Sequence, residues 1–206
     1  MEETLDAAFK DAVSKGGNVT IDVIGVSAKF SGPFLTRVFN KLLTLKPDNL
    51  RLNVQVCVTR PEKLAEWKVT SWMKNCQNSI DIFTDYMEAH CEGLSKSGIK
   101  VAMYEYDNLP HWHGVLLNRQ HLFMGRTEWF QNGDDEFWDL RVGEVEYREF
   151  KLDDHYGGTP RIERFSLWLD RYIARARENG WVHTCGSNCV AEKSVANDTE
   201  TTSKPR

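Results

Sequence analysis

The first part of the chain alternates between helical and strand-like segments, and this alternation constrains the fold more than any other feature. Amphipathic helices are predicted at 3–15 and 31–45, where apolar residues recur at the i, i+3, i+4, i+7 spacing. Strands rich in β-branched residues are predicted at 18–26 and 50–58. The order helix, strand, helix, strand is typical of an α/β sheet with parallel neighbouring strands.

The rest of the chain adds further elements of the same kinds. Residues 62–96 are predicted to form two helices broken near Asn75–Asn78, with Pro61 in the first turn. An amphipathic helix is predicted at 161–180, with Gly180 as its stop. Strands are predicted at 99–106, 111–117, 121–125, 137–142 and 144–152.

Residues 1–182 are therefore predicted to form a single α/β domain, a mixed sheet flanked by helices on both faces. Residues 183–206 are small and polar, and we expect them to form a disordered tail. The 206-residue length fits one domain with a tail.

Charge and composition exclude several classes of function. The net charge of −4 argues against a general nucleic-acid coat, although a local basic patch remains open. No apolar run long enough for a membrane span and no secretory leader is seen. The five cysteines form an odd set, which fits free thiols and a cytoplasmic location. Gly-rich phosphate loops are absent, and no cofactor is expected.

The stretch LPHWHGVLLNRQHLFMGRTEWF, residues 109–130, carries the main candidate site. Side chains alternate across a strand, so His111 and His113 are expected to share a face. They can simply donate hydrogen bonds to carbonyl groups at a sheet end. They can bind a metal if a third ligand comes from elsewhere, such as His121, Glu144 or Glu146. They can also hold a phosphate or exchange protons near neutral pH.

The spacing of this stretch resembles the signature of the phospholipase D superfamily. That signature reads His-x-Lys, four residues, Asp, six residues, Gly-Ser-x-Asn. Here His111 and His113 are followed after four residues by Asn118, and after six more by Gly125-Arg126-Thr127-Glu128. The register is kept without a gap, and the order of elements over about residues 18–175 is similar as well. His113 replaces the family's lysine and Asn118 its aspartate.

The resemblance implies a role for each matching position. His111 would attack phosphorus and form a phosphohistidine. His113 would stand in the lysine's place and carry charge only as an imidazolium, whereas Asn118 would hold an imidazole by hydrogen bonding without a charge. Arg126 would bring a permanent cation suited to phosphate, and Glu128 would join it in binding substrate.

A single motif copy implies a homodimer in which His111 of each subunit faces the other across a two-fold axis. The expected function is thus a phospholipase D-like module that engages a phosphodiester, in nucleic acid or a nucleotide rather than a lipid. It would act as a phosphodiesterase or nuclease, or it would engage the diester with weakened or lost catalysis. The alternative is a non-catalytic dimerisation or sensing domain of a cytosolic system. Neither a metal nor a membrane partner is expected.

Two further groups of residues have ligand chemistry. His183, Cys185 and Cys189 provide three metal-binding side chains in the expected tail, where a reactive thiol pair is an equal interpretation. Glu144 and Glu146 would share a strand face, which is interpreted first as a solvated face.

Overall fold

A computed structural model describes the chain over residues 2–14, 17–29, 31–45, 49–108, 111–131, 138–141 and 147–185. The helices in these residues are α1 (Glu2–Ser14), α2 (Ser31–Leu45), α3 (Pro61–Glu66), α4 (Thr70–Lys96) and α5 (Gly158–Asn179). The strands of the amino-terminal half are β1 (Asn18–Gly25), β2 (Arg51–Thr59) and β3 (Ile99–Tyr106). Those that follow are β4 (Trp112–Leu117), β5 (His121–Arg126), β6 (Glu128–Gln131), β7 (Trp138–Arg141), β8 (Arg148–Lys151) and β9 (Val182–Cys185).

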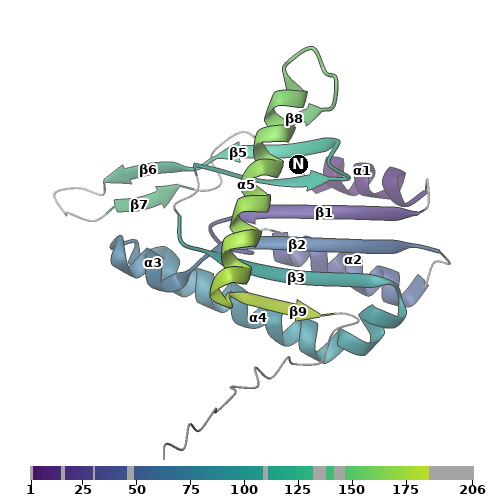
Figure 1. The fold of residues 1–206 in the computed structure, drawn as a ribbon, viewed down its shortest axis with the longest axis horizontal. Helices are drawn as coiled ribbons and strands as arrows, with labels where there is room; N and C mark the ends of the chain where they lie inside the picture. The colour runs from purple at the N-terminus through teal and green to yellow at the C-terminus, as the bar shows by residue number, and fades with distance from the viewer. Residues whose placement is uncertain are drawn as a thin grey trace, which may run out of the picture.

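Seven of these strands form one mixed sheet in the order β8-β5-β4-β1-β2-β3-β9 (Figure 1). β1, β2 and β3 are parallel neighbours, whereas β4 pairs with β1 in the antiparallel sense. The chain thus proceeds from β1 to β2 and β3 on one side, then returns to the other side of β1. Open α/β sheets commonly bind ligands outside the carboxyl ends of their strands, where the strand order reverses in this way.

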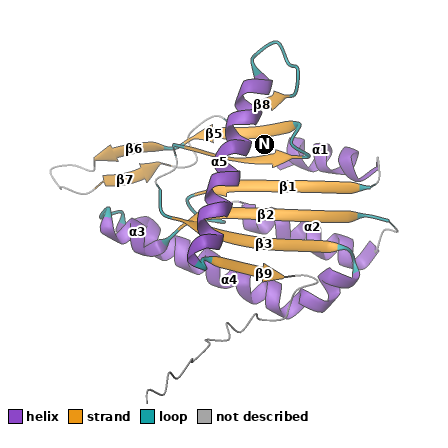
Figure 2. Ribbon diagram, viewed as in Figure 1, coloured by secondary structure: helices purple, strands orange, loops and turns teal. Residues whose placement is uncertain are grey.

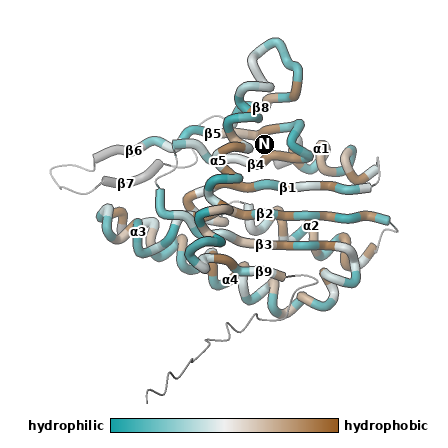
Figure 3. The backbone as a smooth tube through the Cα atoms, in the orientation of Figure 1, coloured by the Kyte–Doolittle hydropathy of each residue, from teal (hydrophilic) through white to brown (hydrophobic). Residues whose placement is uncertain are grey.

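Helices cover both faces of the sheet (Figure 2), which confirms the predicted α/β class. One hydrophobic cluster joins α1, α2 and α4 to the sheet and includes Phe39 and Phe83. A second cluster joins α5 to the opposite face and includes Phe165. Alternation along β1 places Val23 in the first cluster and Ile24 in the second. Hydrophobic segments run through the central strands, while the loop before α5 is hydrophilic (Figure 3).

The predicted helix break at Asn75–Asn78 is wrong, because α4 runs without interruption through these residues. The break lies earlier, between α3 and α4, where Lys68 has a φ of 58°. Cys76 is fully buried, and its Sγ atom contacts the carbonyl oxygens of Val26 and Thr59. Tertiary packing of this turn therefore outweighs the weak helix propensity of the asparagines.

The carboxyl-terminal half differs from the prediction in two places. β6 and β7 form a separate two-stranded sheet that extends beyond the main sheet (Figure 1). β9 pairs with β3, so residues 183–185 of the expected tail belong to the sheet. The remaining tail, residues 186–206, and the predicted strand positions 142–146 lie outside the described residues. None of the described helices has the length and apolar character needed to cross a membrane.

Candidate functional site

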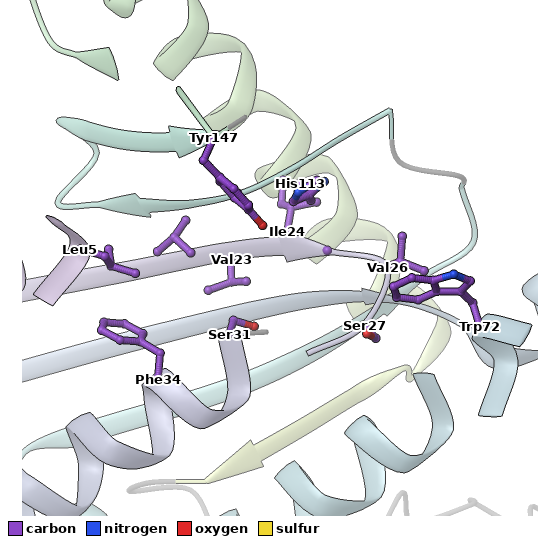
Figure 4. A pocket seen from close by; sticks show the side chains of 13 residues that line it. Leu5, Val23, Ile24, Val26, Ser27, Ser31, Phe34, Trp72, His113 and Tyr147 are labelled. Atoms are coloured by element: carbon purple, nitrogen blue, oxygen red, sulfur yellow. The ribbon is translucent and has the colours of Figure 1, made fainter. Parts of the chain in front are cut away.

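A pocket of about 160 Å³ lies at the carboxyl end of β1, between β4 and the beginning of α2 (Figure 4). Parallel strand β1 delivers the backbone of Gly25 and Val26 to this edge, and α2 begins five residues later. The pocket's polar side chains come from His113, Ser27, Ser31 and Tyr147. Its apolar walls include Leu5, Val23, Phe34, Trp72 and Val115. The described residues that line it include no lysine, arginine, aspartate or glutamate.

His113 is the most buried polar side chain of this pocket, with 4% of its surface exposed. Its Nδ1 atom lies 3.1 Å from Oγ1 of Thr127, and its ring meets the ring of Tyr147 edge to face at 5.0 Å. Burial lowers the pKa of His113 from its ordinary value of 6.5 to about 4. The imidazole is therefore neutral at pH 7 and has one nitrogen left for a ligand.

His111 lies in a different environment from His113. It precedes the first residue of β4 and is exposed, and it is not among the residues that line the pocket. Its carbonyl oxygen accepts a hydrogen bond from the backbone N–H of Thr127 at 2.8 Å, which extends the β4–β5 pairing by one residue. Both histidines thus lie at the same end of the hairpin. His111 is exposed there, whereas His113 is buried.

The second half of the motif also lies at this end of the hairpin. In the β4–β5 register, His113 pairs with Gly125 and Trp112 pairs with Arg126. Arg126 and Glu128 are both exposed, at the end of β5 and the beginning of β6. His111, His113, Gly125 and Arg126 are therefore gathered at one end of the β4–β5 pairing. Glu128 follows it in β6, and neither Arg126 nor Glu128 lines the pocket.

Asn118 is the motif residue that the structure separates from the others. It lies in the turn at the opposite end of β4, about 17 Å from His113 at ~3.4 Å per strand residue. Its Oδ1 atom accepts a hydrogen bond from the backbone N–H of Thr20 at 2.8 Å. Within one chain, Asn118 therefore holds the β4–β5 turn against β1 and does not hold either imidazole.

Sequence reasoning did not identify Ser31, Tyr147 or Thr127 as site residues. Ser31 is signalled weakly, because it follows the carboxyl end of a parallel strand, where ligands commonly bind. Tyr147 reaches the pocket because β8, which follows it, pairs with β5. No local sequence pattern predicts this pairing. Burial raises the pKa of the Tyr147 hydroxyl to about 12, so it stays protonated at neutral pH.

The metal interpretations gain no support from the described residues, which contain no group of three or more His, Cys, Asp or Glu side chains placed to hold an ion. His121 and His183 instead contact single carboxylates, those of Glu149 at 2.5 Å and Glu105 at 2.8 Å. Glu144, Glu146 and Cys189 lie outside the described residues. Cys57, Cys76 and Cys185 are free, whereas Cys91 is disulfide-bonded, so the expectation of free thiols is wrong at Cys91.

Comparison of the chain with protein-family models, with curated proteins and with solved structures finds no match in any of the three.

Proposed function

We propose that the chain is a phospholipase D-like module that engages a phosphodiester at the carboxyl edge of its sheet, with weakened or lost catalysis. The observation that carries this proposal is the β4–β5 hairpin. Its register brings His111, His113, Gly125 and Arg126 to one end, beside a pocket at the point where the strand order reverses. This hairpin carries the motif spacing.

The exposed residues at the rim have the chemistry needed to engage the diester. The imidazole of His111 is accessible to a phosphorus atom, as a nucleophile or as a hydrogen-bond partner. Arg126 is exposed and permanently charged, and its planar guanidinium matches the non-bridging oxygens of a phosphate. The diester we propose for this rim belongs to a nucleotide or nucleic acid rather than to a lipid.

Weakened catalysis follows from the charge at the lysine position. Phosphoryl transfer is stabilised by cations placed where negative charge develops. The His113 side chain in this position is neutral above pH about 4, because its surroundings are apolar. Asn118, in the aspartate position, lies at the far end of β4. Neither His113 nor Asn118 therefore places a charge beside His111 that could assist catalysis.

Turnover would further require a second histidine to protonate the leaving group. The chain carries one motif copy, so this histidine has to come from a second chain. We therefore expect any residual turnover to depend on a homodimer with the two His111 residues facing each other.

The test combines binding with chemical trapping. A short single-stranded oligonucleotide and bis(p-nitrophenyl) phosphate are added to the full chain between pH 5 and 8. The side-chain NMR signals of His111 and Arg126 report binding, and mass spectrometry reports a phosphorylated His111. We expect saturable shifts without an adduct. The His111 shift should be lost in Arg126→Met but not in Arg164→Met, an exposed arginine on α5.

Two outcomes would change the proposal. An adduct that disappears in His111→Ala would show an active phosphodiesterase and contradict the loss of catalysis. Absence of both the NMR shifts and the adduct over the whole pH range would contradict phosphodiester binding and leave the non-catalytic alternative.

The alternative, a dimerisation or sensing domain, is favoured by the β6–β7 sheet. An isolated two-stranded sheet is marginally stable in water. This one extends beyond the main sheet (Figure 1), with α4 beside its strand β7. A partner surface covering it would provide the missing stability. Sedimentation equilibrium distinguishes the two functions when combined with the binding test. A tight dimer that does not bind phosphodiesters supports the alternative, and a monomer contradicts a dimerisation domain.

A further inference from the structure

We infer that the pocket at the carboxyl end of β1 binds a small, uncharged ring that carries a hydrogen-bonding atom, such as a phenol or an indole. This site differs from the one proposed for a phosphodiester, because neither His111 nor Arg126 lines the pocket. The inference therefore stands whether or not the phosphodiester proposal does.

Two buried polar atoms on residues that line this pocket lack hydrogen-bond partners among the described residues. They are Nε2 of His113 and Oγ of Ser31, and both side chains line the same cavity. Native proteins pair nearly all buried polar atoms, because an unpaired one keeps its full desolvation cost. These two atoms belong to residues from distant parts of the chain that line one pocket, and from this we infer that an occupant supplies their partners.

The hydrogen-bonding capacity of these atoms sets what the occupant has to offer. The Ser31 hydroxyl can donate and accept. Nε2 of His113 donates if Thr127 donates to Nδ1, and it accepts if Nδ1 carries the proton. A hydroxyl or a ring N–H group on the occupant can satisfy at least one of the two atoms.

The occupant is uncharged because nothing in the described lining can balance a charge. All thirteen described lining residues are neutral side chains or glycines once His113 is unprotonated. The surroundings already disfavour charge on the pocket's own groups: burial lowers the pKa of His113 and raises that of Tyr147. A buried charge without a partner would be strongly unfavourable.

The size and walls of the pocket favour a ring. Its volume is about 160 Å³, and a cavity of about 150 Å³ with apolar walls is known to hold benzene. Phe34, Trp72 and Tyr147 provide aromatic surfaces for edge or face contacts with a ring. Figure 4 shows Tyr147 and Phe34 on opposite sides of the pocket, with the Tyr147 hydroxyl directed towards Val23 and Ile24.

The inference is tested by titrating the full chain with phenol and with indole, each at up to millimolar concentration. Long-range nitrogen NMR of the His113 imidazole reports occupancy at Nε2. Benzoate and benzylamine serve as charged probes of similar size. We expect saturable shifts of the His113 signals with phenol and indole, and no saturable shift with the charged probes at pH 7.

Variants at Ser31 provide the second measurement. Ser31→Ala removes the unpaired hydroxyl and is expected to weaken phenol binding about two- to ten-fold, as the loss of one neutral hydrogen bond does. Ser14→Ala is the matched control, because the Ser14 hydroxyl is exposed and bonds to the Asp11 carbonyl on α1. Ser31→Leu fills the pocket and is expected to abolish binding, with circular dichroism confirming that the variant is folded.

Three results would overturn the inference. One is the absence of any response of His113 to both uncharged probes. Another is benzoate or benzylamine binding as tightly as phenol. The third is a high-resolution crystal structure grown with phenol in which ordered water alone satisfies Nε2 of His113 and Oγ of Ser31, since the pocket would then be a hydration site.

Discussion

The imidazole of His113 rests against the backbone of Gly125 on the neighbouring strand. A Cβ atom placed on Gly125 would lie 2.7 Å from Nε2 of His113 and 3.0 Å from its Cε1 atom. Two residues further along, Thr127 contacts Nδ1 of the same ring. The glycine and the histidine of the motif are thus coupled physically, because the ring occupies the space that any side chain at 125 would need.

Gly125→Ala is therefore expected to lower the free energy of unfolding by about 1–3 kcal/mol, the usual range for overpacking a well-filled interior. The ring has to move away from residue 125, so its contact with Thr127 is expected to be lost as well. Chemical denaturation measures the first effect, and the nitrogen NMR signals of the imidazole measure the second.

Gly32→Ala is the matched control for this substitution. A Cβ at Gly32 would meet no atom closer than the Cβ of Ala28, at 4.0 Å. Alanine in the first turn of α2 is expected to be neutral or to stabilise by up to about 1 kcal/mol. If both variants change stability equally, the proposed coupling between Gly125 and His113 is absent.

Acid is expected to destabilise the fold through His113. Its pKa is lowered from 6.5 to about 4 in the folded state, so between these values the unfolded chain binds more protons than the folded one. Its contribution to stability is present above pH 6.5 and is lost as pH falls towards 4, and it amounts to roughly 3 kcal/mol. His113→Phe is expected to remove this dependence of the unfolding free energy on pH, as urea titrations between pH 4 and 6.5 would show. His155→Phe at an exposed site is the control.

Asp22 is expected to act in the opposite direction over nearly the same pH range. It is 2% exposed, and burial raises its pKa from 3.8 to about 6 against the attraction of Arg119, whose Nε atom lies 3.7 Å from Oδ2. The folded chain therefore binds the extra proton here. The stability that Asp22 contributes is present below pH 3.8 and is lost as pH rises through about 6.

Asp22→Asn is thus expected to stabilise the protein at pH 7 by roughly 1–3 kcal/mol and to change little near pH 4. With Asp22 replaced, the fall of the unfolding free energy towards acid pH that is due to His113 becomes steeper in a pH series of urea titrations. Asp170→Asn provides the comparison, since Asp170 is exposed and bonds to the same arginine at 2.8 Å. Equal behaviour of the two variants would argue against a buried proton at Asp22.

Much of the central sheet could be predicted from local patterns. The strand predicted at 99–106 is β3. The strand predicted at 18–26 is one residue longer than β1, and the one predicted at 50–58 is shifted by one residue from β2. These strands are buried on both faces and rich in β-branched residues, so packing and local propensity agree. The helix break was missed because the burial of Cys76, which holds α4 together there, depends on contacts with distant strands.

The candidate site was predictable in its position along the chain and not in its geometry. Alternation predicts that His111 and His113 share a face, yet it does not reveal that β4 begins at Trp112 and leaves His111 exposed. Tyr147 reaches the pocket through the β5–β8 pairing. Such long-range pairing has no local signature, so Tyr147 could not be found from sequence spacing.

The last prediction concerns Asn118, whose motif position suggests catalysis and whose contacts indicate a structural role. It has a φ of 51°, next to Arg119 at 53°, and its Oδ1 atom accepts a hydrogen bond from the Thr20 N–H group. Asn118→Ala loses this bond and places alanine in the left-handed region, so unfolding is expected to become easier by about 1–3 kcal/mol. Asn118→Asp keeps an acceptor oxygen and tolerates the same backbone, and it should retain most of the stability. Thermal and urea unfolding measure both variants, with Asn75→Ala, at a partly buried position of α4, as the control. Since Asn118 lies about 17 Å from His113 at ~3.4 Å per strand residue, folded Asn118→Ala is expected to keep wild-type shifts of His111 and Arg126 with the oligonucleotide. Unchanged stability together with lost shifts would contradict the structural role and return Asn118 to the site.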